Sequence, residues 1–212
     1  MFEIFVAAFV TFFVIIDPPG VAPMFATLTE NTSREWQKKM AYKSILVAAC
    51  VIIGFAFGGE WLLGKLHVSL DSFRIAGGLL LFLIAVDMLF EKRTERRDER
   101  NEKVLTEAKK HPERFEDVSV FPLGIPLLAG PGSIATVMLY FSQHKAFLSK
   151  MVVLGSVGLN LFLCLIVFLL APKITKFIGP TIATALERIL GIILAALSAQ
   201  FIIDGIKGAF SL

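Results

Sequence analysis

Charge is scarce over most of this sequence. Asp, Glu, Lys and Arg make up 18% of the 212 residues, and residues 91–117 alone hold nine basic and nine acidic side chains. A soluble domain has about 25% charged residues spread over its surface. The formal net charge is only +3, and no basic stripe carries interleaved aromatic residues. The composition therefore excludes a nucleic-acid-binding surface and argues against a soluble domain.

Cysteine and the common catalytic motifs are also rare or missing. The two cysteines, Cys50 and Cys164, lie inside apolar runs, which argues against a disulfide framework and against a thiolate metal site. The chain has no P-loop, no His-Glu-x-x-His and no Gly-x-Ser-x-Gly sequence. We therefore expect no metal, no cofactor and no nucleotide-driven step.

Apolar residues, in contrast, are abundant. They make up 56% of the chain, and they gather in six runs that approach or exceed the roughly 20 residues a helix needs to cross a bilayer. The runs cover residues 4–28, 41–57, 73–90, 118–141, 151–171 and 188–206. The period-two alternation of a transmembrane barrel is not found. The sequence predicts an all-α membrane protein with six transmembrane helices, the first retained because no basic n-region precedes it.

The distribution of Lys and Arg predicts the orientation in the membrane. The connections after the first, third and fifth runs hold 16 basic residues, whereas the other connections and the termini hold five. Cytoplasmic loops carry the excess of Lys and Arg. We therefore expect the protein to lie in the cytoplasmic membrane with both termini outside the cytoplasm. Residues 91–117 are then a charged cytoplasmic linker, and Trp61 and Tyr140 are predicted as aromatic anchors at the outer interface.

Two short sequences recur at nearly one spacing. Pro19-Gly20 returns as Pro131-Gly132, 112 residues later, and Arg74-Ile-Ala-Gly returns as Arg188-Ile-Leu-Gly, 114 residues later. The two members of each pair occupy corresponding spans of the two halves. This indicates a duplication in which residues 1–90 and residues 118–212 are the two copies. Because each half has three spans, the second copy must be inserted upside down. This predicts two inverted three-helix repeats, a plan typical of secondary transporters.

The first and fourth spans carry the residues that break helices. Proline removes a backbone donor, and glycine allows φ values that a helix does not use. Broken backbone at membrane depth is tolerated where it is buried in protein or lines a polar cavity. Half-helices beginning near the two breaks would direct positive dipole ends at an anionic group such as a carboxylate. The predicted substrate-binding residues of the breaks are Asp17, Pro18, Pro19, Gly20, Val21, Gly130, Pro131, Gly132 and Ser133. Simple proline kinks are the structural alternative.

Three polar positions complete the candidate site. Asp17 has no acidic counterpart in the second half, and it could carry a coupling proton, coordinate Na⁺, hold an ammonium group or cap a half-helix. Asn160 could bind a ligand or join two helices through a hydrogen bond. Gln200 in the sixth span is a weaker candidate of the same kind. No metal ligand set is expected among them.

The sequence around the breaks resembles a known family. Asp17-Pro-Pro-Gly-Val-Ala-Pro23 with Met24-Phe25, and Pro126-Leu-Leu-Ala-Gly-Pro-Gly-Ser133, resemble the paired signatures of the MarC family, six-span proteins related to amino-acid exporters of the LysE type. The resemblance implies transport of small neutral amino acids such as glycine or alanine. The partners would be this zwitterionic substrate, the lipid bilayer and a coupling H⁺ or Na⁺. The substrate, direction, coupling ion and oligomeric state stay open.

Two other classes of function are alternatives to a transporter. An intramembrane enzyme of the aspartyl type could pair Asp17 with Asp87 or Asp204. A channel or a non-transporting membrane subunit would need neither pairing. We predict that the chain is not an enzyme, because no His lies within a span and no protease-like Gly-x-Gly-Asp sequence is found.

Overall fold

The computed structural model describes residues 1–30, 32–90 and 119–210, and every regular element within them is a helix. The elements are α1 (Phe2–Ile16), α2 (Pro18–Leu28), α3 (Arg34–Lys65), α4 (Leu70–Leu89), η2 (Ser119–Leu128), α6 (Pro131–Gln143) and α7 (Phe147–Phe210). The predicted all-α fold is confirmed. The predicted linker, residues 91–117, lies outside the described residues.

Five stretches of the described chain are long and apolar enough to cross a membrane. They are Phe2–Leu28, Arg34–Lys65, Leu70–Leu89, Phe147–Ala171 and Thr184–Phe210. The predicted fourth span is not among them, because η2 and α6 have 10 and 13 residues and each is too short to cross alone. Broken backbone at residues 129–130 thus divides that span into two short helices, as its Pro and Gly content predicts.

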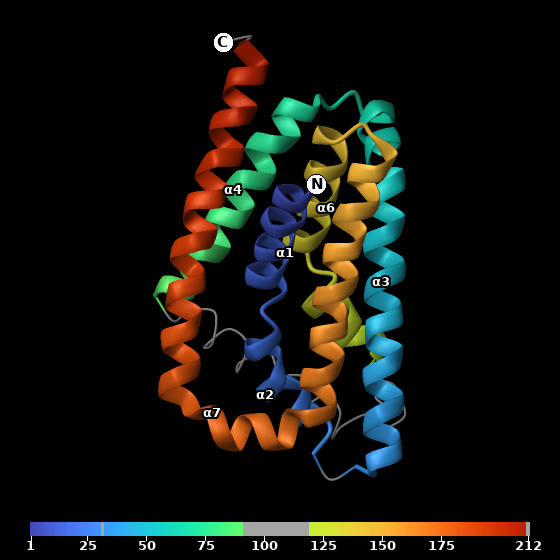
Figure 1. The fold of residues 1–212 in the computed structure, drawn as a ribbon, viewed down its shortest axis with the longest axis vertical. Helices are drawn as coiled ribbons and strands as arrows, with labels where there is room; N and C mark the ends of the chain where they lie inside the picture. The colour runs from blue at the N-terminus through green and yellow to red at the C-terminus, as the bar shows by residue number, and fades with distance from the viewer. Residues whose placement is uncertain (31, 91–118, 211–212) are drawn as a thin grey trace.

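The last helix contains both of the predicted fifth and sixth spans. α7 is one helix of 64 residues that descends, turns across the lower end of the molecule and rises again (Figure 1). We call Phe147–Ala171 its first limb and Thr184–Phe210 its second limb. The sequence predicted two separate spans, whereas the chain between the limbs stays helical.

The segments alternate in direction along the bundle. In Figure 1, α1 with α2 runs downward, α3 rises, α4 descends, and η2 with α6 rises again. With the two limbs of α7 following, both chain ends lie toward the same end of the bundle. The predicted common side of the termini agrees with this path. The side of the membrane on which they lie stays a prediction.

Close backbone contacts join α4 to the second limb of α7. A Cβ atom at Gly78 would lie 2.9 Å from the carbonyl oxygen of Ser198. A Cβ atom at Gly205 would lie 2.9 Å from the carbonyl oxygen of Asp71, near the other end of the pair. Small residues permit this approach, which is how helices associate where lipid supplies no hydrophobic driving force.

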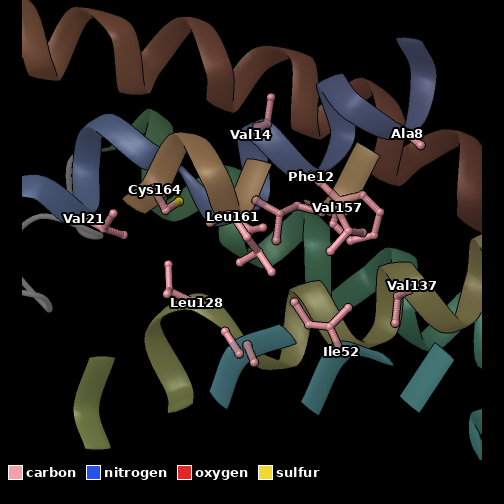
Figure 2. Close-up of a cluster of buried hydrophobic side chains, with 14 of the residues drawn as sticks. Ala8, Phe12, Val14, Val21, Ile52, Leu128, Val137, Val157, Leu161 and Cys164 are labelled. Carbon is pink, nitrogen blue, oxygen red and sulfur yellow. The ribbon is translucent and has the colours of Figure 1, made fainter. Parts of the chain in front are cut away.

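The core is apolar and lies around the first span. Phe12 of α1 points toward Val157 and Leu161 of the first limb, as Figure 2 shows. Below the break, Phe25 of α2 stacks on Phe168 with ring centroids 4.4 Å apart. These contacts fix both halves of the first span against the first limb of α7.

The outer surface is also rich in large apolar side chains, as a protein in lipid requires. Trp61 is 67% exposed, in agreement with its predicted place as an interfacial anchor. Tyr140 is only 6% exposed, so its prediction as an anchor is wrong. Its hydroxyl lies 3.0 Å from the Thr11 hydroxyl, and its ring packs against Phe12, because α6 turns this face toward α1.

Candidate functional site

The first break lies at Asp17, between α1 and α2. The Asp17 backbone has φ 56° and ψ 67°, a left-handed conformation that Asp tolerates better than most residues. Its N–H still donates to the carbonyl of Phe13 at 2.9 Å, which closes the last turn of α1. Pro18 then starts α2, because proline is favoured at the first position of a helix.

Asp17 satisfies the start of α2 by itself. Its Oδ1 accepts a hydrogen bond from the Gly20 N–H at 3.2 Å, and its carbonyl accepts from the Val21 N–H at 3.1 Å. Pro18 and Pro19 have no N–H to satisfy. The carboxyl group is buried, with 1% exposure. The capping role weighed for Asp17 is therefore present in the fold, and it is compatible with a further role.

The second break follows η2, a π-helix. The Ala129 N–H reaches back five residues to the Gly124 carbonyl at 2.9 Å, which is the wider π-type ring. Gly124 packs so closely on α3 that an added Cβ would lie 2.8 Å from Val47 Cγ1. Such π-type turns occur often at functional sites. Gly130 then takes an extended conformation and α6 begins at Pro131.

The start of α6 is built differently from the start of α2. Gly130 is its N-cap, and no side chain caps the helix. The Ile134 N–H donates to the Gly130 carbonyl at 3.0 Å, which is the first bond of the helix. The N–H groups of Gly132 and Ser133 come before this bond and have no carbonyl partner within the helix. The Ser133 hydroxyl donates to the Leu128 carbonyl at 2.9 Å, so it stabilises the end of η2 instead. This terminus keeps the positive partial charge of uncapped N–H groups.

The two breaks meet in the bundle. A Cβ atom at Gly132 would lie 3.2 Å from Ile15 Cγ2 of α1 and 3.0 Å from Ile84 Cδ1 of α4. The last turn of α1 therefore packs directly beside the first turn of α6. Apolar side chains therefore occupy the space beside Gly132 on this side, and its predicted contact with a substrate stays a prediction.

Other parts of the breaks do reach the surface. Pro131 is exposed, and Pro19 and Gly20 are partly exposed, whereas Pro18, Val21 and Ser133 are buried. Asp17, Ala129 and Gly130, the residues of the broken backbone itself, are all buried. The breaks are therefore enclosed by protein, and only part of the first turn of each half-helix reaches the surface.

Asn160 joins two helices. Its Nδ2 donates to the Phe9 carbonyl of α1 at 3.1 Å and to the Ser156 carbonyl at 3.0 Å. Its side chain is fully buried, and its Oδ1 has no hydrogen-bond partner among the described residues. Phe9 precedes Asp17 by eight residues, or about 12 Å of helix. Of the two roles weighed for Asn160, the contacts favour the joining of helices.

Cys164 lies one turn beyond Asn160 on the first limb. Cys164 is fully buried and faces the interior with Leu161 and Val21 (Figure 2). The first limb thus closes one side of the Asp17 break with an apolar wall.

Gln200 does not join the group at the breaks. It is exposed, and its Nε2 donates to Asp204 Oδ1 at 2.8 Å. The neighbouring Phe201 packs on Tyr140, and Ser198 is buried. These two residues mark the inward face of the second limb, and Gln200 lies on a different face.

Two polar residues near the breaks were not predicted there from the sequence: Thr136 was missed, and Tyr140 was assigned to the membrane interface. Thr136 is fully buried with no partner for its hydroxyl among the described residues, and it lies one turn after Gly132. Tyr140 lies one turn further and bonds Thr11. The signal that could have found them is their spacing, because Gly132, Thr136 and Tyr140 recur at intervals of four and so share one helix face.

Fold and break geometry define the class of the protein: a multi-pass integral membrane protein of α-helices. The profile described as "MarC family integral membrane protein" matches residues 2–210, and the chain belongs to that family. A UPF0056 membrane protein of Methanocaldococcus jannaschii is 34% identical over 207 residues, 98% of each chain. UPF0056 membrane protein YhcE of Escherichia coli is 30% identical over 209 residues, 99% of this chain and 94% of the relative. No solved structure matches the chain.

Proposed function

We propose that the protein is a secondary transporter of small neutral amino acids, such as glycine or alanine, in the cytoplasmic membrane. The observation that carries the proposal is the pair of matched breaks, one with a buried carboxylate and one with an uncapped helix start, whose flanking turns touch. A zwitterion has both charges that such a pair would bind. The uncapped start of α6 suits its carboxylate, and Asp17 suits its ammonium group or a coupling cation.

The packing supports the inverted repeats that alternating access requires. η2 and α6 of the second half pack on α3, the second span of the first half. In turn, α1 and α2 of the first half pack on the first limb of α7, the second span of the other half. The third spans of the two halves pack on each other through Gly78 and Gly205. Such reciprocal packing is what a pseudo-two-fold axis in the membrane plane produces.

Coupling to H⁺ or Na⁺ is proposed to depend on Asp17. A carboxylate within a span is costly and marks a functional position, and it can bind a proton or a cation. Its capping bond to Gly20 adds a mechanical link, because a change in the charge of Asp17 changes the strength of the bond that starts α2.

Observations on Asp204 disfavour the enzymatic alternative. Asp204 accepts from Gln200 on the outer side of the second limb, while Asp17 is buried between α1 and α2. An aspartyl dyad needs two carboxyl groups that share a proton. The alternative of a channel is separated from a carrier by the experiment below.

Counterflow in proteoliposomes tests the transporter. Vesicles loaded with unlabelled glycine or alanine should take up labelled amino acid faster than empty vesicles, because only a carrier exchanges substrate across the membrane. Uptake should saturate with concentration. Equal rates in loaded and empty vesicles would indicate a channel, and no uptake of any neutral amino acid would refute the proposal.

The orientation has its own test. Ser69 lies between α3 and α4 and Glu30 follows α2, at opposite ends of the bundle, and both are exposed. In a Cys50→Ser background, Ser69→Cys should react with an impermeant thiol reagent added outside intact cells. Glu30→Cys should react only after the membrane is opened. The reverse pattern would invert the proposed topology.

A further inference from the structure

A polar pair lies on the outer side of the second limb of α7, within the part of the helix that must cross the membrane. The limb Thr184–Phe210 has 27 residues, about 40 Å of helix, against a hydrocarbon core of about 30 Å. Gln200 lies three residues from the middle of the limb and Asp204 seven, roughly 5 and 10 Å from the midplane of a centred helix. Both therefore lie at hydrocarbon depth.

The inward face of the limb packs against α4 and α6. Leu194 and Ser198 are buried, Phe201 packs edge-on against Tyr140, and Gly205 packs against α4. Gln200 points away from all of these contacts and is exposed. Among the described residues its hydrogen-bond partner is Asp204, one turn on, which takes one of the two amide hydrogens. The second hydrogen and the amide oxygen would face hydrocarbon in a single copy of the chain.

An amide and a carboxyl group in hydrocarbon are costly, and polar side chains in spans are accordingly found against protein or water. Two of the residues that surround Gln200 on this face are small, and a third is a large apolar residue. Ala196 lies one turn before it, Ala199 beside it and Ile203 three residues after it, and all three are exposed. Small residues at such a position allow a second helix backbone to approach closely.

We propose that the face of the second limb formed by Ala196, Ala199, Gln200 and Ile203 is the interface of a homodimer, in which Gln200 bonds Gln200 of a second copy. Two copies in one membrane with the same orientation are related by a two-fold axis along the membrane normal. That axis places each residue at the same depth as its counterpart. An amide is both donor and acceptor, so it is self-complementary across this axis, whereas a carboxylate is not.

The choice of a second copy over a different protein rests on this self-complementarity. A partner of another sequence would need its own polar group at this depth. A copy of the chain supplies one without further assumption, and the inward contacts of the second limb stay undisturbed. The proposal does not depend on the transported substrate.

Cross-linking in native membranes tests the proposal. In a Cys50→Ser background, Gln200→Cys and Ala196→Cys should form disulfide-linked dimers on mild oxidation, because a two-fold contact brings the two Cα atoms within the reach of a disulfide. Leu79→Cys is the matched control. Leu79 is 51% exposed on α4 and follows Gly78, which packs against Ser198, so it lies near the same depth on another face. We expect at least fivefold more dimer from Gln200→Cys than from Leu79→Cys.

A second variant measures the contribution of the amide. Gln200→Leu should weaken dimerisation in lipid, measured by energy transfer on dilution, by about three- to thirtyfold in dissociation constant. Leu79→Ile should leave that constant unchanged. An unchanged constant in Gln200→Leu, or equal cross-linking at positions 200 and 79, would overturn the proposal. Labelling of Gln200→Cys by a charged reagent without cross-linking would assign the face to a water-filled path instead, which also overturns it.

Discussion

The two breaks of this protein differ in how the backbone N–H groups at the start of the following helix are capped. At the first, Asp17 caps α2 with its own carboxyl group and two prolines remove the remaining donors. At the second, Gly130 has no side chain to cap α6, and Ser133 turns its hydroxyl toward the preceding helix. One break is therefore closed and the other keeps uncapped backbone donors. In the proposed function, the first break supplies a carboxylate and the second supplies a helix start for an anionic group.

The largest expected effect is at Asp17. Asp17→Asn keeps the size and much of the capping ability but removes the charge. If Asp17 couples transport to an ion gradient, accumulation driven by a pH or Na⁺ gradient should fall to background, while exchange between loaded vesicles persists. Uptake of labelled alanine with and without a gradient measures both. Gradient-driven uptake at the wild-type rate would leave Asp17 with the capping role alone.

The next effect concerns the uncapped break. Gly132→Val would place two methyl groups where a single Cβ is already 3.0 Å from Ile84 and 3.2 Å from Ile15, so we expect a loss of stability of about 1–3 kcal/mol. Ligand-induced thermal stabilisation should disappear as well. Gly54→Val is the control, because nothing lies within 4 Å of a Cβ at Gly54. A stable Gly132→Val protein with full ligand response would show that this turn is not part of the site.

A third variant would make the second break resemble the first. Gly130 has φ −77° and ψ 171°, a conformation that serine adopts without strain and in which its hydroxyl can cap α6. Gly130→Ser should raise the stability by a few tenths of a kcal/mol. Substrate affinity should fall about tenfold, because the new hydroxyl competes with the substrate carboxylate for the N–H groups of α6. A hydrogen bond to a charged group contributes about 1.5–3 kcal/mol. Thermal unfolding with and without alanine measures both, and unchanged affinity would argue against a carboxylate at this terminus.

The smallest effect is purely structural. Ser133→Ala removes the hydrogen bond from the Ser133 hydroxyl to the Leu128 carbonyl and should cost about 1 kcal/mol. Because this hydroxyl is used within the protein, substrate affinity should hardly change. Parallel measurement with Ser72→Ala, on the exposed Ser69–Ser72 pair, provides a surface control. A large loss of affinity with little loss of stability would instead make Ser133 a ligand contact.

Much of this architecture could be predicted from the sequence. The spans follow from their apolar runs, and Asp17, the prolines and the glycines predict both breaks because their backbone preferences are local. What could not be predicted is which way a membrane helix faces. A helix that is apolar on nearly all sides has no polar face to mark its exterior. For this reason Tyr140 was predicted at the membrane interface although it is buried, and Gln200 was predicted at the candidate site although it is exposed on another face.

The continuity of α7 was hidden for a different reason. Proline is expected to end or kink a helix, and the residues between the two limbs include Pro172 and Pro180, yet the backbone stays helical while α7 changes direction (Figure 1). The π-type turn of η2 packs against Val47 of α3, a residue distant in sequence. Neither feature has a local signature.

The bonds of Ser156 and Asn160 have a mechanical consequence. Both side chains are bonded to carbonyl oxygens of α1, those of Phe5 and Phe9, one helical turn apart. Two such attachments along one line resist sliding or rolling of α1 against the first limb. Because α2 is also held to this limb by the Phe25–Phe168 stack, a rearrangement that keeps these contacts moves the first span and the first limb together past α6, along the Ile15–Gly132 contact.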